Sequence, residues 1–144
     1  MAITLQLDLV TPDRLLVSKE VMSVTVPGQE GEFGVLADHT PLMSALAAGE
    51  LIIDDGEQAG ERYVISNGYC EVSGESVTVL VDRAISKESI NLNDAKEELA
   101  TALKALESAA PTAAKSKKID PEIILQKRNR DFAEACIQVH GGRR

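Results

Sequence analysis

The sequence predicts an α+β protein, with an N-terminal antiparallel β-sandwich at residues 1–86 and a C-terminal two-helix antiparallel hairpin at residues 87–144. Up to about residue 85, short apolar runs alternate with a period of two between turn residues, which is typical of a sandwich or barrel. From Leu92 onward the apolar residues recur at steps of three and four, the period of an amphipathic helix. The first 86 residues carry 14 acidic and 4 basic side chains, whereas the remainder carries 9 and 11, so the two parts also differ in charge.

The first expected strand covers residues 3–10, where apolar and polar side chains alternate from Ile3 to Leu9. Residues 11–13 supply a turn, and a second strand is expected at residues 20–26, with Met22, Val24 and Val26 on one face. Further short strands are expected at residues 51–53, 62–66, 69–72 and 77–81, each ending at a turn residue. Together these runs predict the sandwich.

The first helix is expected near residues 92–108, with Asn91 or Asn93 as its N-cap. Its apolar stripe consists of Ala95, Leu99, Ala102, Leu103 and Leu106. Residues 108–118 are interpreted as a flexible connector, because Pro111 lacks the amide hydrogen that a helix interior needs and is expected to end the helix.

The second helix is expected to start at Asp120, a capping acid followed by proline at the first helical position, and to close at residues 141–142. Its apolar stripe consists of Leu125, Phe132, Cys136 and Val139. Neither helix can bury much apolar surface alone, so the two are expected to pack as a hairpin attached to the β domain.

The composition, with 44% hydrophobic and 26% charged residues, is that of a soluble globular protein. A net charge of −8 and only 3% aromatic residues argue against nucleic-acid binding. No apolar run approaches the ~20 residues of a membrane span and no signal peptide is evident, so we expect a cytoplasmic chain. Cys70 and Cys136 fall in different units and are expected to be buried thiols rather than a disulfide.

No catalytic, cofactor-binding or metal-binding constellation is expected. Gly28, Gly31 and Gly34 do not form a dinucleotide fingerprint or a phosphate-binding loop, so they are interpreted as glycines that shape turns. His39 lies beside Asp38, but it has no nucleophile-elbow context and no clustered ligands of a metal site.

The second helix carries a basic cluster, Lys127, Arg128 and Arg130, away from its apolar stripe. This cluster has two interpretations, a solvated helix face or a docking site for an acidic partner. The rest of the molecule is acidic and would repel such a partner, so the cluster is the natural contact for one.

Three segments resemble the epsilon subunit family of bacterial F-type ATP synthases: PGQEGEFGVLADHTPL at 27–42, ISNGYCEV at 65–72 and VTVLVDRA at 77–84. The resemblance implies a non-catalytic subunit of the central stalk, or rotor, that couples proton flow to ATP synthesis. It implies that the β domain contacts the gamma subunit and the ring of c subunits. The loop facing that ring would contain Gly28, Gly31, Glu32, Gly34 and His39.

The same resemblance implies that the helical hairpin is a mobile regulatory domain that can hinder ATP hydrolysis. Lys127, Arg128 and Arg130 would then meet an acidic segment of the alpha/beta catalytic hexamer. The subunit would lie at the cytoplasmic face of the bacterial plasma membrane, associated with it only through the complex.

Some relatives bind ATP through a motif Ile/Leu-Asp-x-x-Arg-Ala at the start of the first helix. Here the corresponding residues 90–95 read INLNDA, so Asn91 replaces the acid and Asp94 replaces the arginine. An aspartate repels the phosphate charge that the arginine would pair, so no ATP binding and no cofactor are expected. Two alternatives are a stand-alone enzymatic or ligand-binding sandwich that uses residues 28–41, and a free regulatory adaptor.

Overall fold

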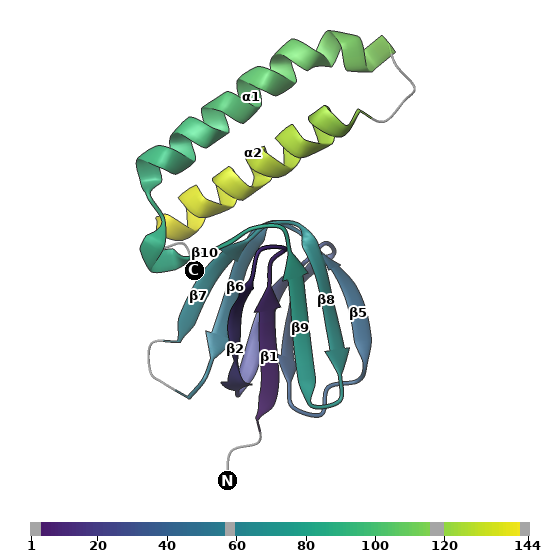
Figure 1. Ribbon diagram of the computed structural model, residues 1–144, viewed down its shortest axis with the longest axis vertical. Helices are drawn as coiled ribbons and strands as arrows, with labels where there is room; N and C mark the ends of the chain where they lie inside the picture. The colour runs from purple at the N-terminus through teal and green to yellow at the C-terminus, as the bar shows by residue number, and fades with distance from the viewer. Residues whose placement is uncertain (1–3, 57–59, 116–119, 142–144) are drawn as a thin grey trace.

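The computed structural model describes residues 4–56, 60–115 and 120–141. A strand-rich sandwich forms one part of the molecule, and two antiparallel helices lie across one end of it (Figure 1). The α+β prediction is therefore confirmed. The ten strands are β1 (Leu5–Val10), β2 (Leu15–Val21), β3 (Ser23–Gly28), β4 (Gly31–Leu36), β5 (Leu42–Leu46), β6 (Gly49–Asp54), β7 (Glu61–Ile65), β8 (Gly68–Ser73), β9 (Ser76–Val81) and β10 (Ala84–Ser86).

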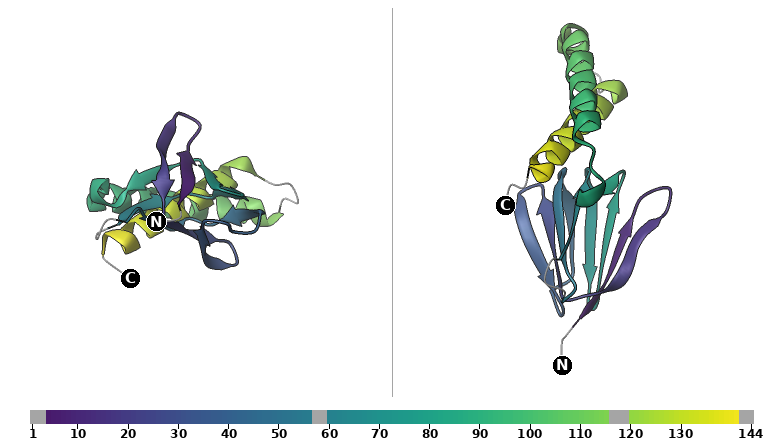
Figure 2. Two further views of the ribbon diagram at one scale, coloured as in Figure 1. Left: turned by 90° about the horizontal axis from the view of Figure 1, so that it is seen from below. Right: turned by 90° about the vertical axis from the view of Figure 1, so that its left-hand side faces the viewer.

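One hydrogen-bonded sheet contains all these strands, in the order β10-β7-β6-β3-β5-β8-β9-β1-β2, and β4 pairs with β3. The sheet folds into two layers at β3, which pairs with β6 along residues 23–25 and with β5 only at Gly28. The described strands are antiparallel except for β1 and β9, which are parallel, so the sandwich is not purely antiparallel as expected. The β1–β2 hairpin projects from the side of the sandwich (Figure 2).

The alternating residues of these strands fill one apolar core. Its fully buried members include Leu7, Leu9, Val24, Val79 and Cys70, which come from the four strands β1, β3, β8 and β9. Burying a leucine or valine side chain contributes about 1.5–3 kcal/mol, so this core is the main source of the sandwich's stability.

The expected strand at residues 20–26 is wrong in one respect, because the chain forms two strands there and breaks at Met22. Val21 and Val24 are both buried although they are three residues apart, and Met22 is exposed. The Met22 amide donates to the carbonyl of Asp54 at 2.7 Å, where the chain crosses from the β1 layer to the β6 layer. Period-two alternation fails at this crossing because each layer sets its own register.

Three strands, β4, β5 and β10, and the first part of β2 have no counterpart among the expected strands. β2 begins at Leu15, soon after the turn expected at residues 11–13, and β4 occupies residues 31–36 of the glycine-rich segment. β4 pairs with β3 along its whole length, from Gly28 opposite Gly31 to Ser23 opposite Leu36. The segment interpreted as a loop is therefore a β-hairpin.

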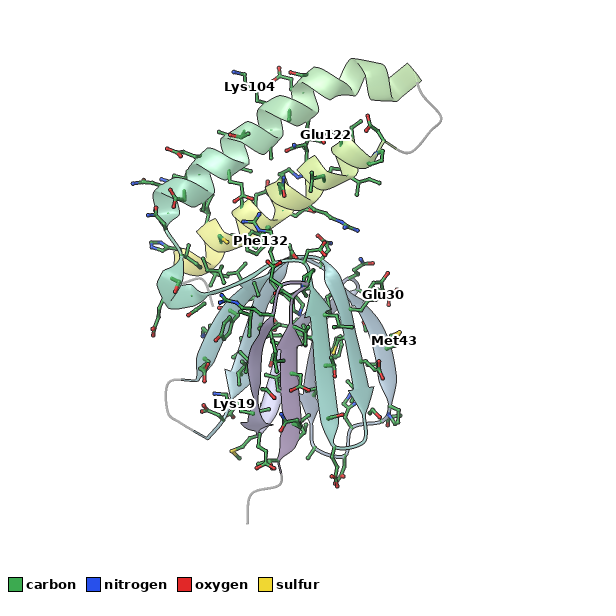
Figure 3. All side chains as sticks on the ribbon, viewed as in Figure 1. Lys19, Glu30, Met43, Lys104, Glu122 and Phe132 are labelled. Carbon is green, nitrogen blue, oxygen red and sulfur yellow. The ribbon has the colours of Figure 1, made fainter. Side chains whose placement is uncertain are left out.

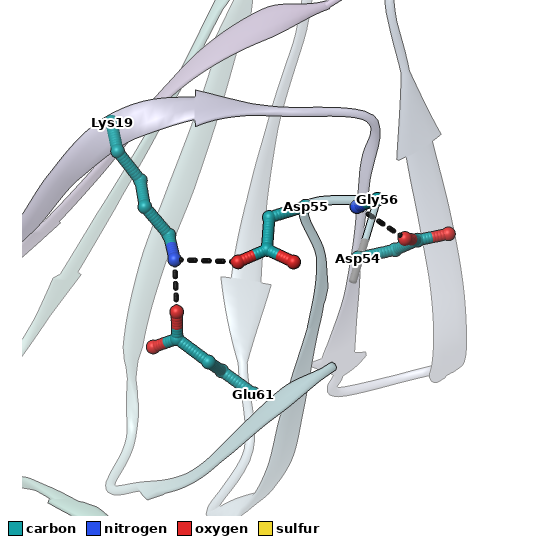
Figure 4. A network of polar contacts seen from close by, with 5 residues as sticks. All are labelled: Lys19, Asp54, Asp55, Gly56 and Glu61. Atoms are coloured by element: carbon teal, nitrogen blue, oxygen red, sulfur yellow. Dashed lines mark hydrogen bonds and ion pairs between the residues drawn. The ribbon is translucent and has the colours of Figure 1, made fainter. Parts of the chain in front are cut away.

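A lysine at the end of the sandwich away from the helices links strands from opposite ends of the sheet order. Lys19 on β2 lies 3.0 Å from Asp55 Oδ2 and also pairs with Glu61 of β7 (Figure 4). The hydrogen bond to the Glu61 carboxylate is the main cause that raises the pKa of Lys19 above its ordinary value. This pairing helps to hold β2 and the β6–β7 hairpin side by side.

After β10, a short 3-10 turn (Lys87–Ser89) leads into α1 (Leu92–Lys115), and α2 (Pro121–His140) follows. Asn91 is the N-cap of α1, since its side chain accepts from the Asp94 amide at 3.1 Å. Asp120 caps α2 as expected, accepting from the Glu122 amide at 2.9 Å. Both helix starts were thus predictable from capping chemistry.

The prediction that Pro111 ends the first helix is wrong, because α1 continues through it to Lys115. Proline inside a helix costs about 3 kcal/mol relative to alanine, yet four alanines at residues 109–114 flank Pro111 and favour the helix. Residues 116–118 of the expected connector lie outside the described residues.

The hairpin packs on the sandwich only through the half nearest to it. α2 lies between α1 and the strands, and Phe132 sits at this boundary (Figure 3). Toward the distal half, the expected stripe residues Leu103 and Leu125 are 47% and 49% exposed, so neither stripe is buried along its whole length. The distal half of the hairpin extends beyond the strands (Figure 1).

Candidate functional site

The turn of the β3–β4 hairpin requires glycine at two of the three glycine positions in this segment. Gly28 and Gly31 form the last pair before the turn, and Gly31 has a φ of +136°, which L side chains rarely adopt. A Cβ on Gly28 would lie 2.6 Å from the carbonyl oxygen of Gly31, so the backbones approach too closely for a side chain. Gly34 has no positive φ and would have open space around a Cβ, so the turn does not require it.

The five residues expected to face the c ring are not brought together. Gly28, Gly31 and Glu32 lie at the end of the sandwich that carries the helices, where Glu30 is seen in Figure 3. β4 then runs along the sheet through Gly34, and His39 follows its far end. The four residue steps from Glu32 to Leu36, at about 3.3 Å each, put roughly 13 Å of strand between Glu32 and the connection that carries His39.

Glu32 lines a groove of about 550 Å³ between the sandwich and α2. The helix contributes Asp131 and Glu134 to the same groove, and β6 contributes Glu50. Glu50 is buried and lies 3.0 Å from Arg62 Nη1, so its charge is partly balanced within the sandwich. In the part of the chain that the structure describes, no group of three His, Cys, Asp or Glu residues is placed to hold a metal ion.

His39 is part of a tight connection rather than of a catalytic group. Its amide donates to the carbonyl of Leu36 at 3.2 Å, and its ring Nδ1 lies 2.7 Å from the carbonyl oxygen of Thr40. Asp38 before it has a φ of 64°. The hydroxyl of Ser44, five residues after His39, donates to the carbonyl of Ala45 at 3.3 Å. The two contacts of His39 lie within the β4–β5 connection and hold its shape, whereas Ser44 belongs to β5.

The three residues of the basic cluster on α2 make different contacts. Arg128 lies 3.4 Å from Asp82 of the sandwich, and both side chains are exposed. Arg130 pairs with the adjacent Asp131 at 3.0 Å, while Lys127 is exposed to solvent. One member of the cluster therefore contacts the sandwich, a role that the sequence analysis did not anticipate.

The outer face of the β5-β8-β9-β1-β2 layer carries an apolar row that the sequence analysis missed. Opposed residues on successive strands form it: Ala45, Tyr69, Leu80, Val10 and Leu15. Tyr69, Leu80 and Leu15 are 59%, 46% and 54% exposed. Leu80 was the available signal, since it occupies an outward position of its strand where alternation predicts a polar residue.

The apolar row borders a groove of about 420 Å³ that reaches the hairpin. Val10, Tyr69 and Leu80 line one part of this groove, and Arg128 of α2 lines another. Exposed contiguous apolar surface rimmed by polar side chains is typical of a protein–protein contact. The geometry thus favours an interaction surface over a catalytic pocket.

Residues 4–87 match the family model described as "ATP synthase, Delta/Epsilon chain, beta-sandwich domain". This chain belongs to that family. The match covers the strands that carry the three resembling segments, and relatives named ATP synthase epsilon chain confirm the resemblance to the epsilon subunit family.

Two relatives named ATP synthase epsilon chain show the extent of the similarity. The one from Magnetococcus marinus is 42% identical over 91 residues, 63% of this chain and 66% of that relative. The one from Desulfosudis oleivorans is 41% identical over 108 residues, 75% and 81% of the two chains. Both names are those of an epsilon chain, a non-catalytic subunit, so the stand-alone enzyme is not favoured.

Two solved structures resemble the fold. A chain of the Euglena gracilis mitochondrial ATP synthase, in a structure of OSCP, F1 and the c-ring, has a TM-score of 0.65 and 30% identity, with 92% of this chain and 79% of that chain covered. A chain of the Tetrahymena thermophila enzyme has a TM-score of 0.54 at 14% identity, covering 60% and 69%, and shows similarity of fold alone. Among the described residues of this epsilon-family chain, no helix is long and apolar enough to span a bilayer.

Proposed function

We propose that the chain is the epsilon subunit of a proton-translocating F-type ATP synthase, where it acts in the central stalk without catalysing bond chemistry. Its family and its epsilon-chain relatives support this role, and so does its likeness to a chain in an F1/c-ring complex. The subunit would couple proton flow to ATP synthesis as part of the rotor. It would be held peripherally at the cytoplasmic face of the bacterial plasma membrane through the complex.

The apolar row is the observation that carries a docking role. Tyr69, Leu80 and Leu15 lie on strands of one layer, so their positions relative to one another are held by backbone hydrogen bonds. A rigid, flat, apolar surface suits permanent contact with another subunit, because it buries area without ordering flexible loops. We propose that this face contacts the gamma subunit.

The contact with the c ring is proposed for residues 28–41. The helices lie at the Glu32 end of β4, and the His39 end is directed away from them. His39 is therefore the member of the set that could meet another subunit without displacement of the hairpin. Replacing His39 with alanine should reduce coupling of proton flow to synthesis and change stability by less than about 0.5 kcal/mol.

The hairpin is proposed to be mobile and to regulate ATP hydrolysis through the alpha/beta hexamer. Lys127, Arg128 and Arg130 would contact an acidic segment there, and Arg128 would exchange Asp82 for that partner. Both Arg128 and Asp82 are exposed, and an exposed ion pair contributes only about 0–1 kcal/mol, so the exchange costs little. Attraction of this kind weakens with salt.

A reconstitution with the gamma subunit tests the docking role. Leu80→Lys places a charge in the apolar row, whereas Thr78→Lys places the same charge on the same strand and face, two residues outside the row. We expect Leu80→Lys to weaken association with gamma at least tenfold, Thr78→Lys to leave it nearly unchanged, and both variants to retain their melting transition. Equal effects of the two variants, or recovery of the wild-type chain without other synthase subunits from solubilised membranes, would contradict the proposal.

A further inference from the structure

The turn between β9 and β10 is fixed to the sandwich through its backbone. The Arg83 amide donates to Ser66 Oγ at 2.9 Å, and the Ser66 amide donates to the Arg83 carbonyl at 2.9 Å. Ser66 is buried at the corner between β7 and β8. The backbone of Arg83 therefore belongs to the sandwich, whatever its side chain contacts.

The side chain of Arg83 leaves the sandwich and contacts both helices. Its two terminal nitrogens pair with the two carboxylate oxygens of Glu98 on α1, with Nη2 at 3.2 Å from Oε2. Its Cζ lies 4.2 Å from the centre of the Phe132 ring on α2. A guanidinium can make both contacts at once because it is planar, pairing through its edge and stacking through its face.

The neighbouring Asp82 makes the pair with Arg128. Among the described residues, the ion pairs between sandwich and hairpin are thus both made by this one turn. The rest of the junction is a small apolar cluster that includes Val64, Ile90, Phe132, Cys136 and Val139. The cluster that fills the sandwich is separate from it and contains no helical residue.

We propose that Arg83 is a latch: its contacts with Glu98 and Phe132 hold the hairpin on the sandwich, and their loss lets the hairpin leave while the sandwich stays folded. The separation of the two apolar clusters is the physical basis, because undocking opens the small cluster and not the core. The latch deepens the regulatory role proposed for the hairpin. Its test uses the isolated chain, so it can fail while the role in the synthase stands.

The exposure of the latch makes it sensitive to its surroundings. About 44% of the Arg83 side chain and 31% of the Glu98 side chain are accessible to solvent. Ions therefore screen this pair, and a carboxylate on another subunit could compete for the guanidinium. Raising the salt concentration should favour the undocked hairpin in the wild-type chain and have less effect once Arg83 is replaced.

The chain contains two cysteines that report on the two clusters separately. Cys136 lies in the junction cluster and is 5% exposed, whereas Cys70 lies in the sandwich core and is 0% exposed. Burial raises the pKa of each thiol to about 11, so both react slowly while they are covered. Undocking exposes Cys136 alone, and global unfolding exposes both.

The experiment measures the rate at which a maleimide modifies each cysteine of the full chain, resolved by peptide mass spectrometry in native buffer. In Arg83→Gln we expect Cys136 to react about tenfold faster than in the wild type, equivalent to ~1.4 kcal/mol, with the Cys70 rate unchanged. Glu98→Gln should give a smaller increase. Adding it to Arg83→Gln should give less than the product of the single effects, because the two residues share one contact.

Two matched variants test whether the hairpin is held by the specific contacts of Arg83 or by any charged residue in this turn. Asp82→Asn, one residue earlier in the same turn, removes only the longer pair and should raise the Cys136 rate by less than about twofold. Arg83→Lys keeps the charge but loses the planar group, so its Cys136 rate should lie between the wild-type and Arg83→Gln values. If Arg83→Gln raises the modification rates of both cysteines equally, Arg83 stabilises the whole fold. If it raises neither rate, Arg83 does not hold the hairpin on the sandwich. Either result overturns the proposal.

Discussion

The sandwich and the hairpin are stabilised in different ways. The sandwich collects buried side chains from residues 5–81 into one core, so each strand depends on partners that are distant in sequence. The hairpin consists of two consecutive helices whose distal apolar residues, such as Leu103 and Leu125, remain exposed, and it meets the sandwich through a small cluster. A rigid body and a lightly attached arm can therefore coexist in one chain.

The largest expected effect concerns the two parts made separately. A chain ending at Ser86 keeps the whole sandwich core and should unfold in one cooperative transition, whereas residues 87–144 alone should show little helix by circular dichroism. Two short helices in water lack the packing that stabilises them in the full chain. A non-cooperative melt of the first fragment would contradict the contrast and the boundary at residue 86.

The next effect compares one leucine from each part. Leu7 on β1 is fully buried in the core, and Leu7→Ala should lower the free energy of unfolding by about 3–5 kcal/mol through lost burial and the cavity left behind. Leu103→Ala on α1 removes the same atoms from a largely exposed site and should change it by less than about 0.5 kcal/mol. Urea denaturation of both variants measures the difference, and similar losses would show that the hairpin is as tightly packed as the sandwich.

The two buried cysteines contribute to the pH dependence of stability at alkaline pH. Burial raises each thiol pKa from 9.0 to about 11, so the native state keeps its protons where the unfolded chain has lost them. The associated stability is fully present below about pH 9 and falls as the pH rises through about 11, by roughly 3 kcal/mol for each cysteine.

The slope of unfolding free energy between pH 9 and 10 is the measurement. Cys70→Ala should reduce this slope, because one of the two buried thiols is gone, while the raised pKa values of Lys19 and Tyr63 supply a part of the slope that remains. Cys136→Ala should reduce it less if the hairpin already undocks at that pH. A slope that neither replacement alters would mean that other groups control the alkaline transition.

The smallest effect compares two glycines of one hairpin in the sandwich. Gly31→Val forces a branched side chain into a φ of +136° and should cost about 1–3 kcal/mol. Gly34→Val occupies an ordinary strand position with open space and should be tolerated or slightly stabilising. Thermal unfolding of the two variants measures this difference. An equal loss of stability in both would show that the turn does not need a residue with positive φ at Gly31.

Several features were determined by the sequence because they depend on neighbouring residues alone. The caps at Asn91 and Asp120 were predictable, since a side chain bonds an amide two or three residues away. The change of period near Leu92 predicted where strands give way to helices, and the alternation of residues 3–9 predicted β1. The family resemblance rested on residues of the same kind.

Tertiary structure decided the rest, because those features depend on residues brought together from distant parts of the chain. The break at Met22 follows from a change of sheet layer, and β4 forms because β3 offers it a complete edge. The apolar row appears only when five strands are aligned in register. Arg83 is an unremarkable turn residue in the sequence, and it gains Glu98 and Phe132 only when both helices fold back over the strand ends, since contacts between distant residues leave no local pattern.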